Sequence, residues 1–216
     1  MRIVVSAGPT REHLDAVRFL SNPSTGRMGF AVARAAKAVG HEVVLVAGPV
    51  ALRTPAGVER RDVVSALDML EAVLDEIGKA DALVMTAAVA DWRPARRASG
   101  KLKKAAMDGT LRLVRNPDIL REVARRVSGL RRRPILVGFA AETGAPDAEA
   151  VRKCREKGLD LVLGNDVSEP GCGFGTRTNR VSWATPDGTV LHPPLLSKDA
   201  IARRIVRFLE RRVAGG

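Results

Sequence analysis

Residues 83–104 read LVMTAAVADWRPARRASGKLKK, and this stretch joins a buried strand to a strongly basic loop. Leu83, Val84 and Met85 predict a strand inside a sheet, after which the side chains become small at residues 86–88. In open α/β sheets, ligands bind outside the carboxyl ends of the strands. Small side chains there let a ligand approach the backbone, and the basic residues that follow favour a polyanion. A solvated surface loop is the alternative interpretation. The basic residues are Arg93, Arg96, Arg97, Lys101, Lys103 and Lys104.

Short apolar runs alternate with amphipathic segments on both sides of this stretch. Strands are predicted at residues 3–7, 41–47, 58–63, 82–86, 135–139 and 159–163. Helices are predicted at residues 27–39, 65–77, 146–157 and 197–213, with a further helix starting near residue 117. Because strands that alternate with helices pair in parallel, the predicted fold class is α/β, with a doubly wound, mostly parallel sheet in a Rossmann-like three-layer arrangement. A turn signal at residues 186–188 adds a C-terminal hairpin extension. Residues 1–216 contain no convincing linker and read as a single domain.

Polar residues mark three expected helix starts. Ser65, with Asp68 three residues later, has the pattern of a capping box, and Ser197 precedes the last helix. Asn116 is expected to cap a helix whose first residue is Pro117, where the missing proline N–H costs nothing. A short surface strand is expected just before it, at residues 111–114.

The composition favours anionic partners. Lys and Arg number 36 against 24 Asp and Glu, which gives a formal net charge of +12. Nucleotides, phosphorylated metabolites and nucleic acid all fit such a surplus. The two cysteines, Cys154 and Cys172, form neither a metal-ligand cluster nor a disulfide framework, and no apolar run is long enough to span a membrane. No signal peptide is apparent, so a soluble, cytoplasmic protein with free thiols is expected.

A second glycine-containing segment lies before the first predicted helix. Residues 24–29 read STGRMG, and free N–H groups at a helix start can hold a phosphate. The pattern is not the GxGxxG of dinucleotide-binding folds. In addition, the strand at residues 41–47 leads into Gly48-Pro49 and carries no acid at its end to hold a ribose. The segment therefore favours an anion site over an NAD site, with a stiffened helix entry as the alternative.

Other residues suggest chemistry without a covalent nucleophile. The three histidines are scattered, and no serine has a nucleophile-elbow context. Asn22 is either a turn residue or an amide donor to a developing oxyanion or a carboxylate. Lys153 and Lys157 are four residues apart and share a helix face, where they either face solvent or bind a triphosphate.

Taken together, several blocks resemble the phosphopantothenoylcysteine synthetase family, which ligates phosphopantothenate to cysteine in coenzyme A biosynthesis. The blocks are GPTRE at residues 8–12, LD at 14–15, VRF at 17–19, SN at 21–22, STG at 24–26, MG at 28–29, AAVADW at 87–92, KLKK at 101–104, NPDI at 116–119, GFAAET at 138–143 and NDV at 165–167. Their shared order along the chain is far more specific than any single block.

The resemblance implies a two-step ligation that uses CTP and Mg²⁺. The carboxylate of 4′-phosphopantothenate attacks the α-phosphate of CTP, releasing pyrophosphate and leaving an acyl-cytidylate. The amine of cysteine then displaces CMP. Neither step needs an enzyme nucleophile, because positioning and charge stabilisation suffice.

The resemblance also implies roles for individual residues. Asn22 and Lys101 are the expected catalytic residues. CTP is expected to contact Thr86, Ala87, Ala88, Asp91, Lys101, Asn116, Pro117, Asp118, Ile119, Phe139, Lys153 and Lys157. Phosphopantothenate is expected at Asn22, Ser24, Thr25, Gly26 and Met28, and the metal ligands stay open.

The family resemblance extends to assembly. Family members are dimers, and residues 179–191 are the expected interface here. Many bacterial relatives are fused behind a flavin-dependent decarboxylase, so such a domain or partner is expected. Three departures stand out: Gly100 replaces a common Glu, Pro23 interrupts the Asn22 loop, and Trp92 replaces Tyr or Phe.

Two rival functions stay open from the sequence. The first is a short-chain NAD(P)-dependent oxidoreductase, although the chain has no Tyr to act as the usual proton donor. The second is a basic nucleic-acid-binding module, although the chain offers no recognition-helix signal and few aromatic side chains for stacking. For a ligase of this family, we expect neither nucleic acid nor a membrane as a partner.

Overall fold

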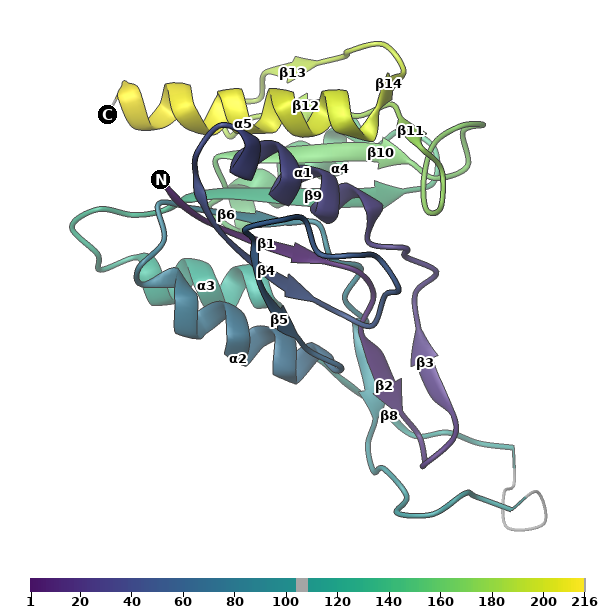
Figure 1. Ribbon diagram of the computed structural model, residues 1–216. Coiled ribbons are helices and arrows are strands. Elements are labelled where there is room, and N and C mark those ends of the chain that lie inside the picture. The colour runs from purple at the N-terminus through teal and green to yellow at the C-terminus, as the bar shows by residue number, and fades with distance from the viewer. Residues whose placement is uncertain (104–108, 216) are drawn as a thin grey trace.

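An eight-stranded sheet forms the centre of the molecule (Figure 1), in a computed structural model that describes residues 1–103 and 109–215. The strand order is β13-β12-β10-β9-β6-β1-β4-β5. The strands are β1 (Arg2–Ala7), β4 (Glu42–Ala47), β5 (Glu59–Asp62), β6 (Ala82–Met85), β9 (Ile135–Glu142), β10 (Leu161–Asp166), β12 (Ser182–Ala184) and β13 (Val190–Leu191). Those from β10 to β5 are parallel, which confirms the predicted fold class.

The order of strands reverses beside β1. The chain proceeds outward from β1 to β4 and β5, then returns to β6 on the other side of β1 and proceeds to β9 and β10. The crevice between β1 and β6, at their carboxyl ends, is therefore the topological switch point where doubly wound folds bind ligands. Four of the six parallel strands, namely β1, β4, β6 and β10, consist almost wholly of buried residues, as parallel strands covered on both faces do.

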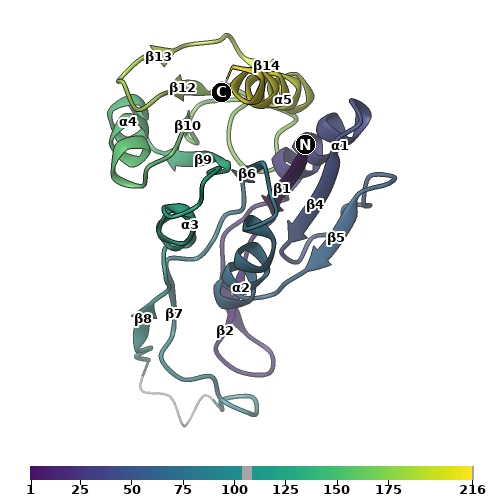
Figure 2. The ribbon, with the colours of Figure 1, turned by 90° about the vertical axis from the view of Figure 1, so that its left-hand side faces the viewer.

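Helices cover both faces of the sheet (Figure 2). One face carries α1 (Arg27–Ala38) and α5 (Lys198–Ala214), whose side chains pack with those of β1 and β4. The other carries α2 (Ala66–Ile77), α3 (Ile119–Val127) and α4 (Asp147–Glu156). The two core clusters consist mainly of Val, Leu, Ala and Ile.

Two small antiparallel pairs extend from the sheet as an arm, defined here as the strands β2 (Arg11–His13), β3 (Phe19–Ser21), β7 (Trp92–Pro94) and β8 (Leu113–Arg115). The arm projects at the bottom of Figure 1. Of these four strands, only β8 was predicted from the sequence, as a short surface strand at residues 111–114. The strands β2 and β3 lie in a segment without apolar alternation, so no sequence pattern announced them. A third pair, β11 (Thr178–Asn179) and β14 (Leu196–Ser197), precedes α5.

The helix starts were predicted correctly at two of three places. Ser65 and Asp68 form the capping box of α2, and the Ser197 hydroxyl accepts from the backbone N–H of Ala200 at the start of α5. The prediction for α3 was wrong. Its cap is Asp118, whose carboxylate accepts from the backbone N–H of Arg121, and Pro117 lies outside the helix.

Asn116 does not cap α3, because its side chain binds the segment that enters β7. Its amide donates to the Ala90 carbonyl at 2.8 Å and accepts from Arg93 at 2.9 Å. Two further strands continue past their expected ends, since β9 runs to Glu142 and β10 to Asp166. The predicted C-terminal hairpin is confirmed, with β12 paired to both β10 and β13. Along the described chain, none of the helices has the length and apolar character that crossing a bilayer requires.

Candidate functional site

Short hydrogen bonds join the carboxyl ends of β1 and β6, and the residues that follow them, at the switch point. The Thr86 hydroxyl donates to the Ser6 carbonyl at 2.7 Å, and the Ala88 N–H donates to the Gly8 carbonyl at 2.9 Å. Glycine is required beside this point because a Cβ on Gly29 would lie 2.5 Å from that of Ala7. The small residues after β6 therefore let helix α1 approach the sheet and leave a crevice beyond it.

Two adjoining cavities occupy this edge of the sheet. Both contact Ala87, Ala88, Phe139, Ala141 and Phe174. The smaller, of about 100 Å³, also contacts Ser24, Thr25, Gly26, Arg27, Met28, Thr86, Asn165, Gly173, Asn179 and Lys198. The larger, of about 790 Å³, also contacts Asn22, Met85, Val89, Ala90, Asp91, Trp92, Arg115, Asn116, Pro117, Asp118, Ile119, Leu120, Arg121, Lys153, Lys157 and Val167. The predicted phosphopantothenate contacts at residues 24–26 and 28 line the smaller cavity, and the predicted CTP contacts Asp91, Lys153, Lys157 and residues 116–119 line the larger one. Ala87, Ala88 and Phe139, predicted at CTP, line both cavities, whereas Asn22 lines the larger, Thr86 the smaller and Lys101 neither.

The smaller cavity lies at the N-terminus of α1. Gly26 caps that helix with a φ of 77°, a left-handed conformation that suits glycine. No side chain caps the first turn and no acidic residue lies in it, so its backbone N–H groups are available to an anion. Thr86, expected at the nucleotide, contacts this cavity instead.

Asn22 lies in the wall of the larger cavity and binds the exit of β6. Its side-chain amide donates to the carbonyls of Ala88 and Val89 at 3.1 and 3.2 Å. The amide therefore joins the loop before α1 to the small residues after β6. The Asn22 side-chain oxygen can only accept hydrogen bonds, whereas stabilising an oxyanion requires the side-chain NH₂ group, which here donates to the two carbonyls.

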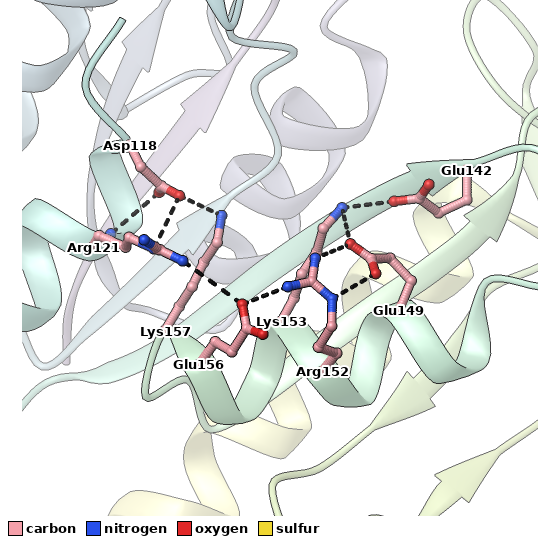
Figure 3. A network of polar contacts seen from close by, with 8 residues as sticks. All are labelled: Asp118, Arg121, Glu142, Glu149, Arg152, Lys153, Glu156 and Lys157. Atoms are coloured by element: carbon pink, nitrogen blue, oxygen red, sulfur yellow. Dashed lines mark hydrogen bonds and ion pairs between the residues drawn. The ribbon is translucent and has the colours of Figure 1, made fainter. Parts of the chain in front are cut away.

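Lys153 and Lys157 project from α4 toward acidic partners (Figure 3). The Lys153 ammonium lies 2.6 Å from Glu142 and 3.4 Å from Glu149, and Lys157 lies 2.7 Å from Asp118. Hydrogen bonds from Arg152, with help from Lys153, lower the pKa of Glu149 to about 2. Carboxylates therefore neutralise both lysines at the rim of the larger cavity, and a polyphosphate would compete with them.

Lys101 lies outside both cavities. It is exposed, and its neighbour Leu102 donates its N–H to the Asp15 carboxylate at 3.1 Å while accepting from Arg18 at 2.9 Å. Asp15 is buried, and hydrogen bonds from Arg18 and from backbone N–H groups hold its pKa well below the usual range. The segment that carries Lys101 is thus bound to the arm. Lys104, the last residue of the KLKK block, lies outside the described residues.

Several cavity residues were not anticipated from the sequence. Asn165 and Asn179 are buried, Lys198 is nearly so, and Phe174 lies between the two cavities. Asn165 belongs to the NDV block, but nothing in the sequence indicated that Asn165 or Phe174 would lie near α1. Lys198 follows the Ser197 cap and reads as an ordinary first-turn residue. These residues can be assigned to the cavities only from the fold, which brings them close to the start of α1.

The described residues contain no group of three His, Cys, Asp or Glu side chains that could hold a metal ion. Asp91 and Asp118 nevertheless contact the larger cavity. Mg²⁺ is commonly bound by one or two carboxylates together with substrate phosphates, so these donors fit an ion that arrives with a nucleotide.

Comparisons with known proteins agree with this architecture. The coenzyme A biosynthesis bifunctional protein CoaBC of Vibrio parahaemolyticus is 46% identical over 206 residues, which cover 94% of this chain and 51% of that protein. The protein of the same name from Bacillus subtilis is 44% identical over 206 residues, covering 95% of this chain and 50% of its own length. The chain thus spans about half the length of the curated relatives that it matches.

The crystal structure of the C-terminal domain of CoaBC superimposes with a TM-score of 0.83 and 38% identity, covering 100% of this chain and 96% of that one. The model of the DNA/pantothenate metabolism flavoprotein C-terminal domain matches residues 1–212. These matches confirm the resemblance that the sequence blocks carried. The chain belongs to the family of DNA/pantothenate metabolism flavoprotein C-terminal domains.

Proposed function

We propose that the protein, through the domain at residues 1–216, ligates cysteine to 4′-phosphopantothenate in coenzyme A biosynthesis. The observation that carries this proposal is the pair of adjoining cavities at the switch point. One presents a helix N-terminus and two cationic side chains, and the other has room for a nucleotide and two lysines at its rim. They meet at Ala87 and Ala88, where a carboxylate and an α-phosphate would be brought together.

In the first step, the phosphopantothenate carboxylate attacks the α-phosphate of CTP. A P–O bond forms, the bond to the β-phosphate breaks, and pyrophosphate leaves. Lys153 and Lys157 would neutralise the charge of the triphosphate after their ion pairs with Glu142 and Asp118 break. The chain's contribution is alignment of the two reactants and charge stabilisation.

In the second step, the cysteine amine attacks the acyl carbon of the acyl-cytidylate. The amide C–N bond forms, the bond to the CMP oxygen breaks, and the amine loses a proton. Asn22 lines the larger cavity and binds Ala88, which contacts both cavities, so that a rotation of the Asn22 amide would offer a donor to the acyl oxygen. Lys101 would act from the arm side of the larger cavity if the segment that carries it closes over CTP.

CTP is the proposed nucleotide, and Mg²⁺ would neutralise its phosphates and be held in part by Asp91 or Asp118. Asn116 and Asp118 line the larger cavity, and their backbone groups would read the base. A decarboxylase would act on the product as a fused domain or a separate partner. The relatives' description as bifunctional supports that arrangement.

A pyrophosphate-release assay tests the proposal directly. Release should require phosphopantothenate, CTP and Mg²⁺, and addition of cysteine should then yield CMP and the amide product. ATP in place of CTP tests nucleotide choice, and EDTA should abolish release. A folded protein that stays silent with every nucleotide would refute the ligase function.

Lys101→Gln tests the assigned catalytic lysine. We expect turnover to fall by roughly 100-fold or more, the range seen when a charged transition-state contact is lost. The melting temperature should stay close to the wild-type value, because Lys101 is exposed. Lys103→Gln, two residues along the same segment, is the matched control. Equal turnover in wild type and Lys101→Gln would remove Lys101 from the mechanism.

A further inference from the structure

A nearly buried ammonium group stands at the smaller cavity. Lys198 is the first residue of α5, directly after the Ser197 cap, and only 8% of it is exposed. Lysine is almost never buried without a partner, because removing its charge from water is costly. Its ammonium group donates a hydrogen bond to the Gly173 carbonyl at 3.0 Å. This is its one side-chain hydrogen bond to the described residues. A neutral carbonyl compensates only part of that cost.

The charges around the smaller cavity are unbalanced. Arg27 contacts the same cavity, and none of the residues that line it is Asp or Glu. Burial lowers the pKa of Lys198, and the positive charge of Arg27 lowers it further. The larger cavity differs, because Asp118 and Glu142 there neutralise Lys157 and Lys153. An anion that fills the smaller cavity therefore has to come from a ligand.

Buried amides and free backbone donors complete the arrangement. Asn165, at the end of β10, is only 6% exposed and contacts the cavity. Asn179 is 5% exposed and accepts from the Gly173 N–H, which holds the loop that Lys198 also holds. The uncapped first turn of α1 faces the same space. These groups surround a cavity of about 100 Å³, a volume suited to one small anionic group.

We propose that Lys198 binds the phosphate ester of the acid substrate and anchors the loop of residues 171–175 over it. The inference rests on the proposed function for the identity of the substrate. A phosphate monoester carries close to two negative charges and several acceptor oxygens at neutral pH, which match two cations, two amides and a helix N-terminus.

The loop lies where an anchor is useful. Gly173 has a φ of 86°, and a Cβ on Gly175 would lie 4.0 Å from the Thr25 side chain, so the loop approaches the segment before α1. The backbone N–H of Lys198 donates to the Arg177 carbonyl at 3.0 Å. One residue thus joins α5, the glycine-rich loop and the anion site.

Binding measurements without nucleotide test this role. Isothermal titration compares 4′-phosphopantothenate with pantothenate, which lacks the phosphate, on wild type, Lys198→Met and Lys198→Gln. Arg204→Met is the control, because it removes an exposed positive charge from the same helix. Losing a charge-assisted contact should weaken phosphopantothenate binding by roughly 10- to 100-fold in both Lys198 variants. Pantothenate binding should change little, and the control should behave as wild type.

Inorganic phosphate separates this inference from the proposed function. It should raise the melting temperature of wild type but not of Lys198→Met, since a ligand stabilises only the state that binds it. If wild type binds phosphopantothenate and both Lys198 variants bind it equally well, the inference fails and the ligase function stands. If wild type does not bind phosphopantothenate but phosphate still raises the melting temperature of wild type and not of Lys198→Met, the proposed substrate is wrong and the Lys198 anion site stands.

Folding of the variants is checked by circular dichroism. Lys198→Gln can still donate to the Gly173 carbonyl, so it isolates the charge from the loop contact if Lys198→Met fails to fold. Lys198→Arg should retain at least part of the phosphate selectivity. Loss of selectivity in Lys198→Arg equal to that in Lys198→Gln would overturn a role for the positive charge.

Discussion

At the scale of single residues, Glu149 and Arg152 form an acid-sensitive ion pair on α4. Glu149 has its pKa lowered to about 2 in the fold, mainly by Arg152. In the unfolded chain a glutamate titrates near 4.3. The folded pKa is the lower one, so its stabilising contribution is present above about pH 4.3 and is lost as the pH falls toward 2. Glu149→Gln should therefore be less stable than wild type at pH 6, by less than about 1 kcal/mol because the pair is partly exposed.

Denaturant unfolding between pH 2 and pH 6 measures this difference, which should shrink toward zero at the acidic end. Glu71→Gln, at an exposed position of α2, is the control and should differ little from wild type at any pH. A constant gap for Glu149→Gln across the range would contradict the ion-pair explanation.

A residue's role could be predicted from the sequence where its partners are close in the chain, and not where they are distant. Ser65 and Ser197 were identified as caps because capping is local. Asn116 was misassigned because its partners, Ala90 and Arg93, lie over twenty residues away and displaced the local preference. Lys198 was missed for the same reason, since its ligand-facing role depends on a loop and a helix distant in sequence.

At the scale of secondary-structure elements, the approach of α1 to the sheet decides whether the crevice exists. A Cβ on Gly29 would lie 2.5 Å from the Ala7 Cβ and 2.7 Å from the Thr86 hydroxyl. Gly29→Ala should therefore lower the free energy of unfolding by about 1–3 kcal/mol, the range for overpacking, and impair ligand binding at both cavities. Chemical denaturation and calorimetric titration measure the two effects.

Gly78→Ala is the matched control for this prediction. Gly78 ends α2 in a right-handed helical conformation, and a Cβ there meets nothing within 4 Å. That substitution should be neutral or stabilising by about 0.4–1 kcal/mol, because it restricts the unfolded chain. Similar losses in both variants would mean that glycine flexibility, rather than close packing, matters at Gly29.

Elements with a strong periodic pattern could be predicted, and elements without one could not. The buried strands and the five helices of the described residues follow hydrophobic periodicity, with α3 starting two residues later than predicted. The strands β2 and β3 have no such pattern, because the arm carries little core and is held by contacts such as those of Asp15. Because no hydrophobic pattern marks these residues, the attachment of the Lys101 segment to the arm could not be predicted either.

At the scale of the whole molecule, the open end of the sheet favours pairing with a second copy of the chain. The edge strand β13 leaves backbone groups on its outer side without a strand partner in the sheet, and Leu191 is 62% exposed. Edge strands of this kind readily pair. We therefore predict a homodimer through residues 179–191, as the family resemblance also implies, with light scattering as the measurement.

Substitutions at two exposed apolar positions locate that interface. Leu191→Lys should yield monomers, because a charge at the edge opposes pairing. Val17→Lys, in the turn that connects β2 and β3 of the arm and 57% exposed in wild type, should leave the dimer intact. The reverse outcome would move the interface to the arm, whose β3 and β7 also expose Phe19 and Trp92. That result would bring the partner close to the Lys101 segment, and dilution below the dimer dissociation constant would then lower turnover as well as mass.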